Sequence, residues 1–145
     1  MVEKSANAKW QGSLTEGSGT FSVESGVITD SPVTWAVRTG AADGKTSPEE
    51  LIAAAHSTCY AMAFSHALSS AGTPPESLDV TSKVGFGPNP EGGMKVTHSH
   101  LTVKGNVPGM TQEQFQTAAT EAEKGCPVSN ALRNNIEITV EATLA

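Results

Sequence analysis

The first third of the chain alternates apolar and polar residues in short stretches, a pattern typical of strands with one buried face. Residues 10–14 and 20–24 flank the turn-rich tetrad 16–19, and this arrangement predicts a hairpin. A third strand is predicted over 33–38, where valine and tryptophan alternate with threonine, alanine and arginine. A loop is expected over 40–46.

Three further strands are predicted in the second half of the chain. Apolar residues and one serine share a face over 78–86, a turn rich in glycine and proline follows at 87–93, and the chain returns over 94–103. Residues 136–144 alternate aliphatic side chains with glutamate and threonine. That alternation predicts a last strand with one apolar face.

A helix start is recognisable at Ser47, Pro48, Glu49 and Glu50. Serine suits the cap, proline suits the first helical position, and a glutamate stands three residues after the cap. Both carboxylates also suit the positive end of the helix dipole. The helix is predicted to run to about 71 and to stop at the glycine that follows.

This long segment carries no Asp, Glu, Lys or Arg between Leu51 and Pro75. A helix that is uncharged all round is either buried in a protein or spans a membrane. Its histidine, serine and threonine residues make it too polar for a membrane span. The pattern therefore predicts a central, buried helix.

Two more helices are predicted before the last strand. Thr111 and Gln114 have the spacing of a capping box, and that helix should end just before Gly125. Cys126 and Pro127 look like the cap and first position of a short helix. The complete order of strands and helices indicates an α+β protein with a mostly antiparallel sheet.

Composition narrows the possible classes of protein. The chain has 145 residues, of which 37% are hydrophobic and 17% charged, as expected for a single domain over 1–145 and not for a disordered or fibrous chain. The formal net charge of −6 and the small number of aromatic residues argue against nucleic-acid binding. The chain opens without the pattern of a signal peptide, so a cytoplasmic protein is expected.

The candidate chemistry lies in the two cysteines, Cys59 and Cys126. In a reducing compartment a cysteine pair is more often catalytic, redox-sensing or metal-binding than a structural disulfide. Burial in the middle of a helix raises the pKa of a thiol, so a reactive Cys59 would need a nearby cation or hydrogen-bond donor. Cys126, at a predicted helix N-terminus, is better placed to be a thiolate. Spacing alone leaves open which thiol reacts first, or whether both are inert core residues.

Glu49 precedes Cys59 by ten positions on the predicted helix. Ten residues of straight helix rise roughly 15 Å, so these side chains of one chain cannot touch. If Glu49 serves Cys59, it comes from a second copy of the helix. The spacing therefore gives the hypothesis of a homodimer with its site at the interface.

The motifs together resemble the OsmC/Ohr family of osmotically inducible and organic hydroperoxide resistance proteins. The resemblance is carried by residues 47–56 leading into Cys59 and by the motif Gly-Cys-Pro-Val-Ser at 125–129, and it spans nearly the whole chain. It implies an OsmC/Ohr-like fold, an intertwined homodimer in which antiparallel sheets surround two long central helices.

The same resemblance implies roles for individual residues. Cys59 matches the peroxidatic cysteine and Cys126 the resolving cysteine, while Glu49 matches the family glutamate ten positions before the first cysteine. The Ohr branch carries its arginine in an early loop, which has none here. Arg38 matches the arginine of the OsmC branch, which follows the third strand.

The activity implied by the family is a peroxiredoxin-like, thiol-dependent reduction of organic hydroperoxides to alcohols. It would pass through a sulfenic acid on Cys59 and a disulfide with Cys126, recycled by a dithiol of the lipoyl type, without a metal or organic cofactor. Tyr60, Met62 and Phe64 are candidates to line a pocket for an alkyl hydroperoxide. The family relates such activity to oxidative and osmotic stress.

Other uses of the same residues stay open. The cysteine pair could serve a non-enzymatic redox sensor or lie inert in a structural stress-response protein. A zinc site of Cys59, Cys126 and His56 would leave one coordination position unfilled. His56 is more simply a packed core histidine, and His98 and His100 are more simply solvated side chains on one face of a strand.

Overall fold

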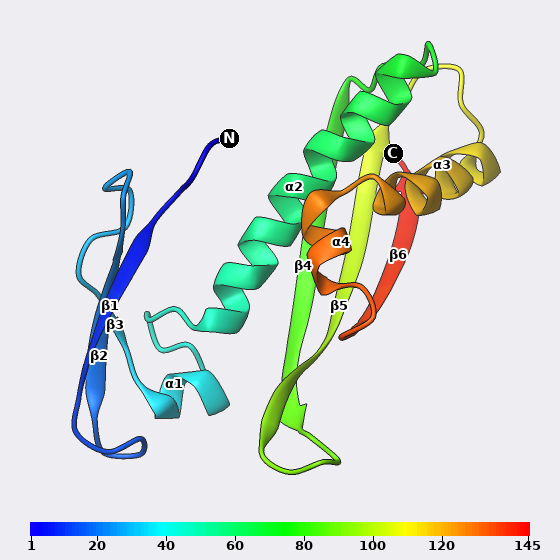
Figure 1. The fold of residues 1–145 in the computed structure, drawn as a ribbon. Coiled ribbons are helices and arrows are strands. Elements are labelled where there is room, and N and C mark those ends of the chain that lie inside the picture. The colour runs from blue at the N-terminus through cyan, green and yellow to red at the C-terminus, as the bar shows by residue number, and fades with distance from the viewer. The chain divides into compact units, whose positions relative to one another are not determined.

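The computed structural model describes the whole chain, residues 1–145. Two compact units are present, Met1–Leu51 and Ile52–Ala145. Each contains its own three-stranded sheet, and helices accompany both (Figure 1). This mixture of helices and separate sheets is the α+β class that the sequence predicted.

The sheet of the first unit is formed by β1 (Ala6–Gln11), β2 (Ser18–Val23) and β3 (Ser31–Val33). All three strands are antiparallel, so the predicted hairpin is confirmed, although it lies a few residues earlier than expected. Its turn requires glycine at one position, because a Cβ on Gly17 would lie 2.3 Å from the Ser13 carbonyl oxygen.

The predicted third strand is wrong beyond Val33. A short helix, α1 (Trp35–Thr39), takes its place, and the Thr34 hydroxyl caps it by accepting a hydrogen bond from the Val37 amide at 3.3 Å. Over so few residues, alternation of apolar side chains fits one helical turn as well as a strand. The threonine cap decides between them.

The long helix α2 (Pro48–Ser70) has the predicted bounds. The Ser47 hydroxyl accepts from the Glu50 amide at 3.2 Å, and the chain leaves the helix through Gly72, whose φ of +85° suits glycine. One prediction about α2 is wrong for the isolated chain: only one stripe of the helix is buried. The opposite face is uncharged and open, with Met62 64% exposed.

In the second unit, β4 (Ser77–Pro88) and β5 (Met94–Asn106) form a long antiparallel hairpin, and β6 (Glu137–Leu144) pairs with β5 in parallel. The parallel pairing is made possible by the crossover through α3 (Gln112–Lys124) and α4 (Pro127–Leu132). The predicted capping box is confirmed, with Thr111 and Gln114 bonded reciprocally at the start of α3.

Helices α2 and α3 pack on the same face of this sheet. Tyr60 and Phe64 from α2 meet Phe115 from α3, with ring centroids of Phe64 and Phe115 5.2 Å apart. The Tyr60 hydroxyl donates to the Ala119 carbonyl at 2.7 Å, which satisfies its only buried polar atom. None of the helices combines the length and apolar character that crossing a membrane requires.

Candidate active site

Arg38 and Glu49 form the most closely bonded ion pair of the first unit. The Arg38 Nη2 atom donates to Glu49 Oε1 at 2.8 Å, and Nε donates to both carboxylate oxygens at 3.1 and 3.2 Å. The two residues come from the last turn of α1 and the first turn of α2. A two-point contact of this kind fixes the plane of the guanidinium as well as its position.

Burial in this pair is uneven. Glu49 is only 6% exposed, whereas about a third of the Arg38 side chain, 33%, is open. A buried carboxylate needs a charged or hydrogen-bonding partner, and Arg38 supplies it. The guanidinium therefore satisfies Glu49 and at the same time reaches the surface.

An apolar cavity of about 550 Å³ lies beside Arg38 within the first unit. Its walls come from the sheet, from α1 and from the start of α2, and include Trp10, Phe21 and Trp35. A hydrocarbon group of moderate size would be removed from water here, next to a cation. These lining residues were not anticipated from the sequence, because they are scattered over several elements.

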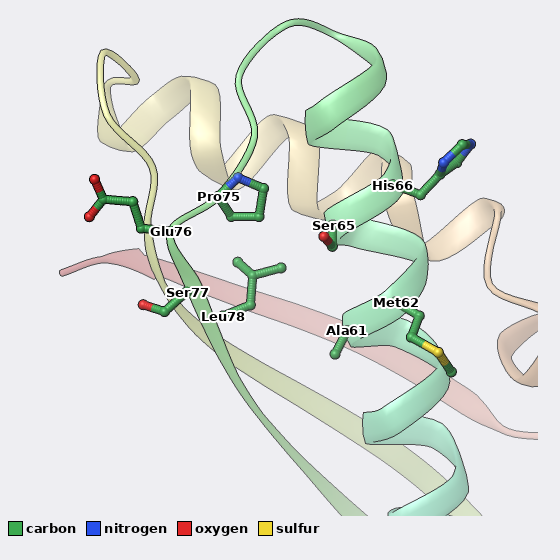
Figure 2. A pocket seen from close by; sticks show the side chains of 8 residues that line it. All are labelled: Ala61, Met62, Ser65, His66, Pro75, Glu76, Ser77 and Leu78. Carbon is green, nitrogen blue, oxygen red and sulfur yellow. The ribbon is translucent and has the colours of Figure 1, made fainter.

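The residues expected to line a pocket lie elsewhere. Tyr60 and Phe64 are completely buried in the core of the second unit and are not available to a substrate. Met62 lines a different cavity of about 510 Å³, between α2 and the start of β4 (Figure 2). Pro75 and Leu78 face the helix there, and no cysteine or arginine is among the lining residues.

Cys59 and Cys126 come together in the second unit although 67 positions separate them in the sequence. Both are free thiols; Cys126 is fully buried and Cys59 partly. Cys59 lies mid-way along α2, and Cys126 is the N-cap residue of α4. The packing of α4 against α2 brings the two side chains together.

Three influences act on the Cys59 thiol. Burial raises its pKa, a hydrogen bond from the Val128 backbone opposes that rise, and the neighbouring Cys126 side chain raises the pKa further. Within the second unit Cys59 is thus held mainly as a thiol. A reactive Cys59 was expected to need a nearby cation or hydrogen-bond donor; the Val128 backbone is such a donor, and the groups that shift the pKa of Cys59 here include no cation.

His56 is completely buried one turn before Cys59. Its Nδ1 atom lies 2.7 Å from the Ser99 hydroxyl and its Nε2 atom 2.7 Å from the Ser129 hydroxyl. Burial lowers the pKa of His56, and the nearby Glu123 opposes this in part. It is therefore the packed, satisfied histidine that was expected, and both of its ring nitrogens are already occupied by serines.

His98 and His100 share the outer face of β5, and their rings stack with centroids 4.2 Å apart. Glu137 of β6 lies 3.9 Å from His100, a proximity created by the parallel pairing of β5 and β6. No group of three histidine, cysteine or carboxylate side chains is arranged to hold a metal ion.

The structure thus brings the four sequence-predicted site residues together as two pairs. Arg38 and Glu49 form one pair in the first unit, and Cys59 and Cys126 form the other in the second unit. Their catalytic roles stay predictions. Ser99 and Ser129 were not singled out from the sequence, since nothing in a serine's neighbours along the chain reveals a buried histidine across the fold.

Comparison with known proteins gives the family. Residues 40–141 match the model of the family described as OsmC-like protein. "Peroxiredoxin OsmC" of Escherichia coli K12 is 38% identical over 143 residues, covering 99% of this chain and 97% of the relative. The chain belongs to the OsmC-like family.

Two further relatives agree with this assignment. An "Organic hydroperoxide resistance protein" of Xanthomonas axonopodis pv. citri is 36% identical over 103 residues, covering 70% of this chain and 69% of the relative. The crystal structure of the organic hydroperoxide resistance protein OhrB of Bacillus subtilis matches with a TM-score of 0.76 at 24% identity, covering 96% of this chain and 98% of that one. That match supports the OsmC/Ohr fold, and the names of the family's members are of the peroxidase type.

Proposed function

We propose that this OsmC-like protein is a thiol-dependent peroxidase that reduces organic hydroperoxides to alcohols. The observation that carries the proposal is the packing of Cys126 beside Cys59, two free thiols from distant parts of the chain. Cys59 is the attacking residue and Cys126 the resolving one. The names of relatives as peroxiredoxin and as organic hydroperoxide resistance protein support the same reaction.

The reaction has two bond-forming steps. The Cys59 thiolate attacks the distal peroxide oxygen, the O–O bond breaks, and the leaving alkoxide takes a proton to become the alcohol. Cys59 is then a sulfenic acid. The Cys126 sulfur attacks the Cys59 sulfur, the S–O bond breaks, and the oxygen leaves as water once protonated. A dithiol reduces the resulting disulfide by exchange.

Activation of Cys59 is assigned to Arg38, whose guanidinium Glu49 holds in place. The cation would favour the thiolate and offset the effect of burial. Glu49 and Cys59 stand ten positions apart on α2, so we assign the Arg38–Glu49 pair to the Cys59 of a second copy. The protein would then be a homodimer with two composite sites.

The open face of α2 supports association between two copies. Ala54, Thr58 and Met62 are exposed there, and from Ala54 onward the face carries no charge. An uncharged, partly apolar helix face of this length is unusual on a monomer's surface. Burying it against a second α2 would complete the arrangement of two central helices that the family resemblance implies.

The cavity beside Arg38 supports an organic substrate. The cavity has apolar walls, which include Trp10, Phe21 and Trp35. Burying an alkyl or aryl group against them contributes to the binding free energy of an organic hydroperoxide, whereas hydrogen peroxide has no apolar surface to bury. The peroxide oxygens would lie toward the guanidinium. A dithiol reductant and a reducing compartment such as the cytoplasm complete the proposal, because the cycle needs both cysteines returned to thiols.

Consumption of cumene hydroperoxide with dihydrolipoamide as reductant tests this function. We expect steady turnover by the wild type, no turnover by Cys59→Ser, and one oxidation without disulfide formation by Cys126→Ser. Full turnover by Cys59→Ser would rule out the assignment. A single slow oxidation of the wild type with no dithiol-driven turnover would indicate a redox sensor instead.

A further inference from the structure

His56, which the proposed reaction does not use, joins the two helices that carry the cysteines. It lies three residues before Cys59 on α2, and its partner Ser129 lies three residues after Cys126 on α4. On each helix the bonded residue is therefore one turn away from the thiol. The contact runs between the same two helices as the contact between the sulfurs.

A small number of polar contacts hold helix α4 in place. It is six residues long, and its N-cap residue Cys126 makes no side-chain capping bond. The bond from Ser129 to His56 ties it to α2; in addition, the Val128 backbone bonds to the Cys59 thiol, and the C-cap residue Arg133 bonds to Glu123 of α3 at 2.7 Å. Ser129 and His56 are both fully buried, so water does not compete for this bond.

The proton positions in this group can be assigned by counting. The Ser129 hydroxyl has no other acceptor nearby, so its single proton goes to His56 Nε2. Nδ1 then carries the ring proton and donates to Ser99, whose hydroxyl donates to Ser82 at 3.0 Å. A neutral imidazole with this tautomer satisfies every group, and it anchors α4 through His56 to strands β5 and β4.

We infer that His56 is a positioning residue that holds Cys126 beside Cys59 through Ser129, and so favours closure of the Cys59–Cys126 disulfide. It touches neither peroxide nor sulfur in this role. The role in turnover rests on the proposed function. The effect on the thiol pair itself does not, since any dithiol–disulfide exchange reports it.

The first measurement is the equilibrium between the Cys59–Cys126 pair and reduced and oxidised dithiothreitol, in the full-length protein. Ser129→Ala removes the hydrogen bond to His56. It should lower the equilibrium constant for forming the Cys59–Cys126 disulfide about three- to tenfold, the size expected for one buried hydrogen bond. His56→Leu should lower this equilibrium constant by a similar factor. His56→Gln should recover part of the loss, because its amide can still bond Ser129.

Tyr60→Phe is the matched control. It removes another fully buried hydrogen bond of α2, from the Tyr60 hydroxyl to the Ala119 carbonyl at 2.7 Å, which does not involve α4. We expect it to lower the free energy of unfolding about as much as Ser129→Ala while leaving the exchange equilibrium unchanged. Equal exchange equilibria for Ser129→Ala and wild type, with both folded, would overturn the inference.

A second measurement follows one turnover with cumene hydroperoxide. Oxidation of Cys59 by the first equivalent should keep its wild-type rate in Ser129→Ala, whereas disulfide closure should slow. With excess peroxide, a second equivalent should therefore oxidise more of the Cys59 sulfenic acid to sulfinic acid than in the wild type. If the wild type does not consume peroxide at all, the proposed function fails and the exchange equilibrium still decides the role of His56. If peroxide is consumed but closure is as fast in Ser129→Ala as in wild type, the positioning role fails alone.

Discussion

The Arg38 guanidinium bonds to both carboxylate oxygens of Glu49, at 2.8 Å from Nη2 to Oε1 and 3.2 Å from Nε to Oε2. Glu49 is buried and Arg38 is partly open, so the carboxylate fixes the orientation of a guanidinium that solvent still reaches. This difference in exposure is expected where a carboxylate orients an arginine side chain. It leads to the first prediction.

Glu49→Gln should lower the rate of reaction with cumene hydroperoxide about 10- to 100-fold. The amide keeps the size of the side chain but loses the charge-assisted bonds, which contribute about 1.5–3 kcal/mol. Stopped-flow oxidation of Cys59 measures the rate. Lys124→Gln, which breaks an exposed ion pair with Glu121, is the control and should behave as wild type. An unchanged rate in Glu49→Gln would show that Arg38 needs no orientation.

Leu14→Asp should reduce the preference for cumene hydroperoxide over hydrogen peroxide about tenfold. Leu14 lines the cavity beside Arg38 and is 57% exposed, so the substitution adds a charge at the rim at little cost in folding. The ratio of kcat/KM values for the two peroxides is the measurement. Val27→Asp places the same charge on an 82% exposed valine that does not line this cavity, and it should keep the wild-type ratio.

Met62→Glu should convert the proposed dimer to monomers. The residue lies on the open, uncharged face of α2, where two carboxylates would face an apolar surface or one another. Sedimentation velocity measures the change, and peroxide turnover should fall with it because each proposed site takes residues from both copies. Thr102→Glu, on the outer face of β5, should leave the mass unchanged. A monomeric wild type with full activity would contradict the composite site.

The free energy of unfolding should decrease as the pH is lowered, in part because the buried His56 resists protonation in the folded state. Burial lowers the pKa of His56 in the folded state, so the unfolded state binds more protons as the pH falls below about 6.5. Stability from this group is therefore complete above that pH and is lost below it, with a slope of at most about 1.4 kcal/mol per pH unit. Urea unfolding from pH 7.5 to pH 5 measures the slope.

In His56→Gln this part of the slope should disappear, because the amide does not titrate. His66→Gln is the control, since His66 is an exposed residue of the same helix. The same slope in wild type and His56→Gln would mean that other groups cause the acid sensitivity.

Local signals predicted the helices well and the third strand badly. Thr111 and Gln114 stand at the capping spacing, and Ser47 and Pro48 mark the start of α2, because capping chemistry lies within four residues. The apolar alternation around Trp35 led to the wrong prediction of a strand. Two or three alternating apolar and polar residues do not distinguish a strand from one turn of helix when a cap residue precedes them.

Only the residues that belong to the family motifs could be predicted as parts of the candidate site. Cys59, Cys126, Glu49 and Arg38 are marked by the motifs and their spacing, and the structure pairs them two by two. The cavity around Trp10 and Phe21 and the serines around His56 depend on the packing of distant elements. No local sequence pattern encodes such packing.

The parallel pairing of β6 with β5 has a consequence for synthesis of the protein. The connection between these strands contains Cys126, and the eight-residue strand β6 holds its far end in the sheet. We expect a nascent chain that still lacks those residues to leave the sulfur accessible. Pairing of β6 with β5 would then be the event that encloses it.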